Sequence, residues 1–188
     1  MISSIVSERT PDLHEHALGV TELVLALAVS LGLTGSELDE LAHAAKLHDV
    51  GKMAIPEEIL TKPSSLSDDE WAFMRRHTLI GERILKAAPA LQRVAALVRS
   101  THERWDGAGY PDGLSGEDIP LASRIIFICD SFDAMTTERP YHPALSVPAA
   151  LAELRNCSGT QFDPGLVDIF CADADGLLAA QHGARASA

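Results

Sequence analysis

Hydrophobic residues recur every three or four positions along most of this 188-residue chain, a spacing that places side chains on one face of an α-helix. The first run starts at Pro11, which suits a first helical turn, and closes at Gly32. Ser36 and Asp39 then have the form of an N-cap and N3 pair ahead of a second run. The apolar positions of the second run are Leu38, Leu41, Ala42 and Ala45. Both runs predict amphipathic helices with one buried face.

The rest of the chain predicts five more helices. Ser67 with Glu70 has the form of a capping box, and Asp163 with Pro164 has the form of an N-cap and a first helical residue. Pro89 interrupts the pattern between two of the runs. The predicted segments cover residues 67–88, 91–102, 121–135, 147–154 and 164–171.

The domain organisation that follows is simple. No internal repeat or interior linker is apparent, so we expect one all-α domain over residues 11–175. Residues 1–10 are expected to form a loose N-terminal segment, and residues 176–188, rich in Ala, Gly and polar residues, a disordered tail.

One apolar segment fits two assignments. Residues 125–129 are apolar on all sides, so a buried β-strand competes with a buried helix. The absence of turn residues and the continuation of the pattern at intervals of four through Asp130 favour the helix. A carboxylate in so apolar a helix is rarely fully buried without compensation. Asp133, one turn further on, is expected to cap the helix or to pair with Arg139.

Composition and charge narrow the setting. The net charge of −12 excludes a broad basic surface for a nucleic-acid polymer, but not a small anionic ligand. No apolar run approaches the roughly 20 residues of a membrane span, and no signal peptide is visible. An odd number of cysteines in helical surroundings favours reduced thiols and a cytoplasmic location away from the membrane. The cysteines are Cys129, Cys157 and Cys171.

The adjacent polar residues His48 and Asp49 end the second apolar run on its buried face. Each lies seven residues, about two helical turns, after an apolar position. An isolated charge in an apolar interior costs on the order of several kcal/mol, so the carboxylate needs a strong partner. A metal ion suits both side chains, whereas a hydrogen-bonded pair at a helix end is the alternative for this dipeptide alone.

The same inward placement recurs in other predicted helices. Each such histidine, taken singly, also fits a core residue hydrogen-bonded to a carbonyl. The inward-facing candidates are His16, His48, Asp49, His77 and Asp130, with His102 as a sixth. Together they predict a metal centre in the core of a helical bundle. Mixed nitrogen and oxygen ligation suits Fe, Mn or Zn, and the lack of a close cysteine pair argues against a structural zinc site.

The motifs around these candidates resemble the HD-GYP domains, a branch of the HD metal-dependent phosphohydrolases. The resemblance covers roughly residues 11–172 and rests on motifs in the right order at the right spacing. These motifs are residues 48–52 (HDVGK), His77, residues 102–111 (HERWDGAGYP), residues 130–135 (DSFDAM) and residues 139–141 (RPY). The resemblance implies a single bundle of about seven helices around a core metal centre of two or three ions. It also implies hydrolysis of the bacterial second messenger cyclic di-GMP or a related cyclic dinucleotide.

The resemblance also implies roles for individual residues. The positions that resemble metal ligands are His16, His48, Asp49, His77, His102 and Asp130. Asp49 resembles the ligand that bridges two ions, and Asp12 occupies the place of a glutamate that helps to hold a third. Lys52 resembles a residue that reaches the scissile phosphate, which makes Asp49 and Lys52 the expected catalytic residues. The positions expected to contact substrate are Lys52, Tyr110, Arg139 and His142.

Cofactors and partners follow from the same resemblance. We expect two divalent transition metals, Fe or Mn first, with Zn, Ni or Mg as alternatives. A sensor, receiver or GGDEF-type domain is the expected kind of signalling partner, and a homodimer is a further expectation. The glycine-rich residues 106–113 fit either a close approach of backbone to a ligand or a plain surface loop.

Three positions depart from the pattern of the family. Thr101 stands where the first histidine of a His-His pair is usual, His142 where a basic residue is usual, and Gly19 where an arginine is common. Thr101 removes a nitrogen ligand and so weakens the second metal site, unless His102, a water molecule or Asp12 takes its place. The leading hypothesis is a cyclic dinucleotide phosphodiesterase, and the alternative is a degenerate module that binds metal, nucleotide or a partner without turnover. A hydrolase of mononucleotides is disfavoured by the glycine-rich stretch around Tyr110.

Overall fold

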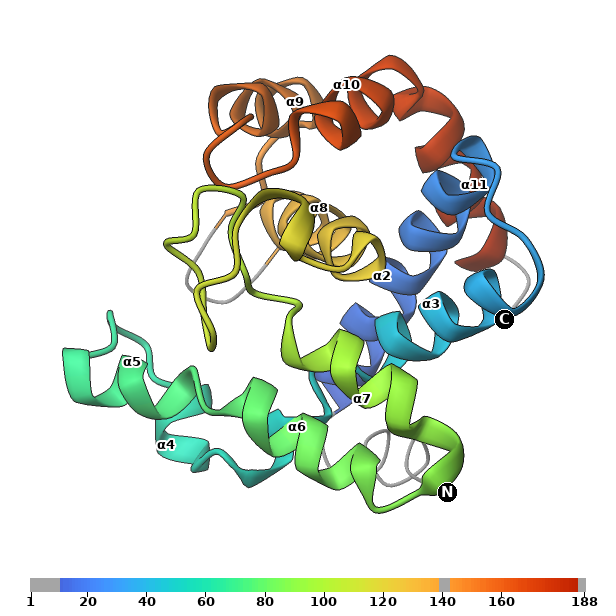
Figure 1. Ribbon diagram of the computed structural model, residues 1–188. Helices are drawn as coiled ribbons and strands as arrows, with labels where there is room; N and C mark the ends of the chain where they lie inside the picture. Colours follow the sequence, from blue (N-terminus) through green and yellow to red (C-terminus); the bar gives the residue numbers. More distant parts are fainter. Residues whose placement is uncertain (1–10, 139–142, 186–188) are drawn as a thin grey trace.

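The computed structural model describes the backbone of residues 11–138 and 143–185, and within these ranges it is built from helices without a β-strand (Figure 1). The predicted all-α class is therefore confirmed. The longer helices are α2 (Pro11–Ser30), α3 (Gly35–Leu47), α5 (Asp68–Met74), α6 (His77–Lys86), α7 (Gln92–Arg99), α8 (Leu121–Thr136), α9 (Val147–Asn156), α10 (Pro164–Ala172) and α11 (Ala174–Arg185). The short elements are α4 (Glu57–Leu60) and the 3₁₀ turns η1 (Val50–Ala54), η2 (Pro89–Leu91) and η3 (Gly116–Asp118).

Helix α8 is the central element of the core. It contacts α2, α3, α7, α9 and α10, and Figure 1 shows it between α9 and α10 on one side and α7 on the other. This position explains why the segment is apolar on all sides, and it confirms the helix over the competing strand. The fully buried apolar residues of α8 are Ile125, Ile126, Ile128, Cys129 and Phe132.

The predicted helix over residues 67–88 is two helices. It begins as predicted, because the Ser67 side chain and the Glu70 side chain form the capping box. However, α5 ends at Met74, and α6 begins at His77 after a turn at Arg75 and Arg76. The break allows α6 to turn and pack against η1, which is a tertiary contact that the helical pattern does not encode.

Other helix ends differ from the prediction by a few residues. Helix α3 starts at Gly35 with Thr34 as its N-cap, two residues earlier than Ser36 predicts. Helix α7 ends at Arg99, so His102 lies beyond the helix and not on its face as predicted. The N-cap of α10 is as predicted, because the Asp163 carboxylate accepts from backbone N–H groups of the first turn.

The predicted disordered tail from residue 176 is wrong for the segment up to residue 185. Those residues continue α11, which packs against α2 and α10. Leu177 is 1% exposed and belongs to the hydrophobic core. The high content of small residues hid a short apolar face that docks on the bundle. The predicted loose segment 1–10 lies outside the described residues.

No helix in the part of the chain that the structure describes is long and apolar enough to cross a membrane.

The close packing of η1 on α6 depends on a glycine. A Cβ atom added at Gly51 would lie 1.9 Å from the His77 carbonyl oxygen and 2.6 Å from the Gly81 nitrogen. Both neighbours are backbone atoms, so neither can move aside as a side chain would.

Replacing Gly51 with alanine should force η1 and α6 apart. We expect Gly51→Ala to reduce the free energy of unfolding by about 1–3 kcal/mol, the usual cost of overpacking. Urea unfolding measures the change. Gly165→Ala is the matched control, because its added Cβ would make only an ordinary 3.4 Å contact with an Asp163 side-chain oxygen. Equal unfolding midpoints for the two variants would contradict the role of Gly51.

Candidate metal centre

The end of α3 places His48 and Asp49 at the centre of the molecule. The backbone leaves helical geometry at Asp49, whose φ and ψ are −98° and 6°, and η1 follows. His48 is 0% exposed and Asp49 is 7% exposed. Because Gly51 holds η1 against α6, the first residue of α6 also reaches this point. His77 Nε2 lies 3.5 Å from Asp49 Oδ1.

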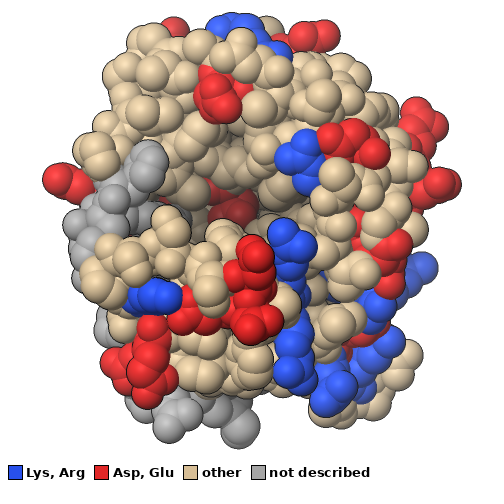
Figure 2. Space-filling model, turned by 90° about the vertical axis from the view of Figure 1, so that its left-hand side faces the viewer, with Lys and Arg blue, Asp and Glu red and all other residues tan. Residues whose placement is uncertain are grey.

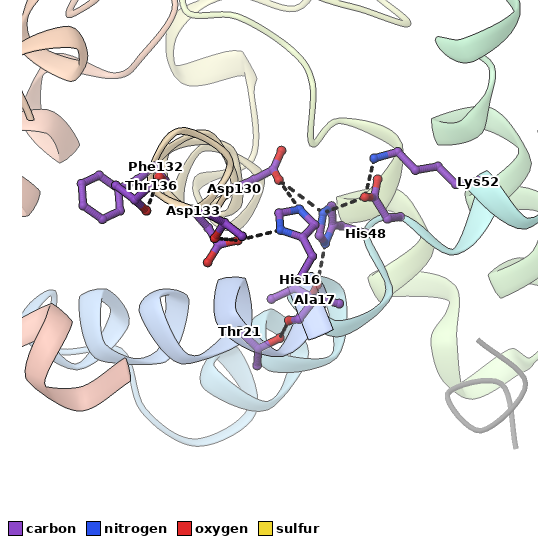
Figure 3. Close-up of polar contacts among 12 residues, drawn as sticks. His16, Ala17, Thr21, His48, Lys52, Asp130, Phe132, Asp133 and Thr136 are labelled. Atoms are coloured by element: carbon purple, nitrogen blue, oxygen red, sulfur yellow. Dashed lines mark hydrogen bonds and ion pairs between the residues drawn. The ribbon is translucent and has the colours of Figure 1, made fainter. Parts of the chain in front are cut away.

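Three of the histidines are held through Nδ1. His48 and His77 each donate from Nδ1 to the carbonyl oxygen three residues earlier in the chain, at 2.7 and 2.9 Å. His16 donates from Nδ1 to Asp133 Oδ2 at 2.7 Å (Figure 3). Carbonyl and carboxylate oxygens only accept, so each Nδ1 carries a proton. Histidines that bind metals are usually oriented in this way, which leaves Nε2 as the potential ligand atom.

Asp130 projects from α8 toward the same point. Its Oδ1 atom lies 2.9 Å from His16 Nε2 and 3.7 Å from His48 Nε2 (Figure 3). Its side chain is 16% exposed, so it is mostly but not fully buried. Asp130 and Asp133 therefore hold His16 from both ring nitrogens.

Two groups of potential ligand atoms share Asp49. One consists of His16, His48 and Asp49, the other of Asp49, His77 and His102, and within each group the atoms lie within 4.8 Å of one another. The Nε2 atoms of His48, His77 and His102 and Oδ1 of Asp49 are buried with no hydrogen-bond partner among the described residues. Buried polar atoms are nearly always satisfied, so four together indicate a missing partner. Imidazole nitrogens with carboxylate oxygens suit divalent transition metals.

The first group favours protonated imidazoles when no metal is bound. Burial alone lowers the pKa of His16, but the hydrogen bonds to Asp130 and Asp133 outweigh burial and raise it to about 9. For His48, burial likewise opposes the charged form, and the nearby Asp49 and Asp130 carboxylates outweigh it and raise the pKa. A metal that binds on this side must therefore displace protons.

The second group favours neutral imidazoles. Burial lowers the pKa of His102 to about 3, and burial also lowers the pKa of His77 despite the opposing effect of Asp49. Burial would raise the pKa of Asp49, but the positive charge of Lys52 and the neighbouring imidazoles outweigh it and hold this pKa well below its usual range. These groups are thus in the protonation state that metal coordination needs.

Lys52 lies three residues after Asp49, in η1. Its Nζ atom donates to Asp49 Oδ2 at 2.5 Å, and its side chain is 22% exposed (Figure 3). The ammonium group therefore sits between the buried carboxylate and solvent. This position allows Lys52 to reach an anion that approaches Asp49 from outside.

The glycine-rich segment folds back on His102. The Tyr110 ring stacks on the His102 ring with centroids 5.2 Å apart and planes 14° apart. A Cβ atom at Gly109 would lie 2.3 Å from the Arg104 nitrogen, so only glycine permits this return. The close approach expected for residues 106–113 is therefore to the chain's own backbone, and it places Tyr110 against the centre.

The remaining predicted residues are placed unevenly. Thr101 is 1% exposed, and its hydroxyl donates to the Val98 carbonyl oxygen at 3.0 Å. Gly19 is buried within α2. The backbone of Asp12 belongs to α2, but its side chain lies outside the described residues. Those that lie wholly outside the described residues are Arg139 and His142.

Sequence reasoning missed two supporting carboxylates. Asp133 was not expected to hold His16, although its place one turn after Asp130 put it on the same side of α8. Glu103 is 2% exposed, and its Oε1 accepts from the Asp112 backbone N–H at 2.7 Å. It thereby ties the end of the glycine-rich segment to the residue next to His102. Only its position beside that histidine signalled such a role.

Comparison with known proteins gives a consistent result. A family model described as "HD domain" matches residues 1–166. The "Cyclic di-GMP phosphodiesterase" of Thermotoga maritima is 40% identical over 90% of this chain and 47% of its own length. The "Cyclic di-GMP phosphodiesterase response regulator RpfG" of Xanthomonas campestris is 46% identical over 76% of this chain and 38% of its own length. The chain thus spans less than half the length of these curated relatives.

A solved structure shares the fold. The structure described as an HDG"Y"P protein from Bdellovibrio bacteriovorus superposes with a TM-score of 0.72 at 21% identity, over 86% of this chain and 52% of that one. This shared fold confirms the predicted HD-domain bundle. Together with the family model and the curated relatives, it confirms the resemblance to HD-GYP domains stated from the motifs.

Because Asp49 belongs to both groups, its loss should have a larger effect than the loss of any histidine. We expect elemental analysis after loading with Mn²⁺ to show that Asp49→Ala loses the metal of both groups. His16→Ala should lose only the first and His77→Ala only the second. Asp106→Ala, which removes an exposed carboxylate outside both groups, is the control for charge. Equal losses in all three site variants, with circular dichroism unchanged, would contradict the shared position of Asp49.

Metal uptake by the first group should depend on pH through His16. Its pKa of about 9 means that affinity on this side should fall at least about tenfold for each pH unit below 9, and more steeply where His48 must lose a proton as well. Asp133→Asn removes one charge that favours the imidazolium, so it should weaken this pH dependence. Calorimetry between pH 6.5 and 9 measures it.

The same proton should also affect the metal-free protein. A raised pKa contributes stability that is present below pH 6.5 and lost as the pH rises through 9. For the metal-uptake experiment, an affinity of the wild type that does not change between pH 6.5 and 9 would contradict the raised pKa of His16.

Proposed function

The chain belongs to the HD domain family, and on that basis we propose that it is a metal-dependent phosphodiesterase that hydrolyses cyclic di-GMP or a related cyclic dinucleotide. The observation that carries the proposal is the buried Asp49 carboxylate, which two groups of potential ligand atoms share. Four atoms of these groups have no hydrogen-bond partner among the described residues. The names of the curated relatives support the substrate class.

His16, His48, Asp49 and Asp130 would hold the first ion, and Asp49, His77 and His102 the second. Asp12 is a candidate for a further contact. Such ions, when bound, polarise phosphoryl oxygens and make water a stronger nucleophile at neutral pH. Fe or Mn are the proposed metals because the donors are imidazole nitrogens and carboxylate oxygens, with Zn, Ni or Mg as alternatives.

The protein's own side chains bind and orient the phosphate. Lys52 carries a positive charge beside Asp49 and can shift from this carboxylate to a phosphate oxygen, where it offsets the charge that develops in the transition state. Tyr110, stacked on His102, forms one wall of the site beside the proposed metal ligands. Arg139 and His142, beyond the described residues, remain proposed substrate contacts.

A degenerate binding module is the second candidate, and Thr101 is the observation that favours it. Its hydroxyl is engaged by the Val98 carbonyl oxygen, so the second group has two imidazoles and a shared carboxylate where the family pattern has a further histidine. A second metal held by fewer ligands would bind weakly and turnover would be slow.

We further propose a cytoplasmic setting and control by a sensor, receiver or GGDEF-type domain. A homodimer is also part of this proposal.

Hydrolysis of cyclic di-GMP by purified protein tests the function directly. With added Mn²⁺ or Fe²⁺ under anaerobic, reducing conditions, we expect slow turnover that rises with metal concentration. Thr101→His should raise both the occupancy of the second site and the rate, because imidazole is a stronger ligand than a hydroxyl. Thr101→Val, which keeps the side-chain shape and removes only the hydroxyl, should leave both unchanged.

Two outcomes would count against this account. Fast wild-type turnover with two full sites and no gain from Thr101→His would show that the missing histidine is dispensable. Absence of hydrolysis in both proteins at full metal occupancy would favour the binding module.

A further inference from the structure

A cavity of about 410 Å³ opens beside the candidate metal centre, within the usual range for small-ligand sites. It shares His102 and Tyr110 with the centre, so a ligand in one can extend into the other. Figure 2 shows the side of the molecule to which α5 and the glycine-rich segment turn; this side is hollowed, with acidic atoms at the floor and Lys and Arg side chains beside it. The remaining lining residues are Trp71, Arg75, Arg104, Ala108, Gly109, Phe127 and Gln161.

Aromatic rings from three elements line the cavity. Trp71, on α5, is 46% exposed although it is one of the largest apolar side chains of the protein. Tyr110 comes from the glycine-rich segment, and Phe127 from α8 meets the His102 ring edge-on, with centroids 5.8 Å apart. Flat aromatic surfaces of this kind bind nucleobases by stacking, whatever the base. The rings therefore account for binding of a base but not for a choice between bases.

Three side chains of the cavity, Arg75, Arg104 and Gln161, carry N–H donors. The Arg75 guanidinium lies 5.5 Å from the centroid of the Tyr110 ring and has no carboxylate partner among the described residues. Unlike Arg75, Arg104 is held by Asp106 in a two-point ion pair, with N···O distances of 3.0 and 2.6 Å. The Arg75 guanidinium can therefore bind a ligand in the cavity. It is a positively charged group in a chain whose net charge is −12.

Gln161 is turned so that it adds another donor. Its side-chain oxygen accepts from Arg104 Nη1 at 3.3 Å, which leaves the amide NH₂ as its remaining polar group. Arginine has no acceptor at all. Arg75 and Gln161 therefore each present N–H donors to a base in the cavity.

The N–H donors of Arg75 and Gln161 would bind guanine and adenine differently. Guanine presents two acceptors, O6 and N7, on one edge, and a guanidinium can bind both. Adenine presents N7 beside an N6 amino group, which is a donor and would face the donors of Arg75 and Gln161. We propose that this cavity binds a guanine base of the substrate and that Arg75 selects guanine over adenine. The inference rests on the proposed function, since it places the phosphate at the metal centre and the base beside Tyr110.

Binding of cyclic di-GMP and cyclic di-AMP to metal-loaded protein, measured by calorimetry, tests the proposal. We expect the wild type to bind cyclic di-GMP at least about tenfold more tightly, the usual effect of one two-point contact with guanine. Arg75→Ala should abolish most of that preference by weakening cyclic di-GMP alone. Arg76→Ala is the matched control, because it removes the same charge from the next residue, whose guanidinium lies over Phe73 and does not line the cavity. The Mn²⁺ content of all three proteins, measured by elemental analysis, should be the same, because arginine has no acceptor atom that could bind a metal.

The outcomes separate the two proposals. Equal affinity of the wild type for both dinucleotides, or equal weakening of both by Arg75→Ala, would overturn the guanine site. The second result would mean that Arg75 contacts phosphate. Guanine-selective binding that depends on Arg75, but without hydrolysis of any dinucleotide, would contradict the phosphodiesterase and leave the guanine site standing.

Discussion

The buried carboxylate of Asp49 is the group on which the rest of the centre depends. A carboxylate that is 7% exposed in a helical core must be offset by positive charge or a metal, because burial alone would leave it strongly destabilising. The fold supplies Lys52 from the next turn, His48 from the preceding residue and His77 from α6. The third of these requires the close contact that Gly51 permits. Local geometry at the end of α3 and the packing of α6 thus serve a single electrostatic requirement.

The two sides of the centre solve this requirement differently. Around His16, the carboxylates of Asp130 and Asp133 favour a proton, so the metal-free protein can satisfy its charges by itself. Around His102, burial lowers the pKa despite the nearby charges of Asp130 and Asp49, which favours the neutral ring. The Nε2 atom of this ring has no hydrogen-bond partner among the described residues. A metal that binds on the first side would therefore displace protons, whereas the second side is already deprotonated but would offer fewer ligands. Under the proposed function, Thr101 would increase this asymmetry, because it adds no nitrogen donor where the pattern that the motifs resemble has a histidine.

Much of the fold and of the site could be predicted because it depends on the spacing of apolar and polar residues within single helices. Apolar periodicity located the principal helices, and the inward placement of His16, His48 and Asp130 followed from the same pattern. The break at Arg75 and Arg76 could not be predicted, because it is caused by packing of α6 on η1 and not by a residue that ends helices. The docking of α11 was not predicted for a related reason. Its short apolar face is buried only because α11 packs against α2 and α10, which the sequence pattern of α11 alone does not show. The cavity beside Tyr110 unites residues from α5, α8 and two loops, which no local pattern relates.

The central claim is that Asp49 lies between two metal ions, and anomalous diffraction from crystals of the Mn²⁺-loaded protein tests it most directly. The account predicts two anomalous peaks on either side of the Asp49 carboxylate, about 3.5–4 Å apart as in other two-metal sites. One peak should lie near His16 and His48, and a weaker one near His77 and His102. A single peak that does not contact Asp49, or two peaks of which neither does, would contradict the account.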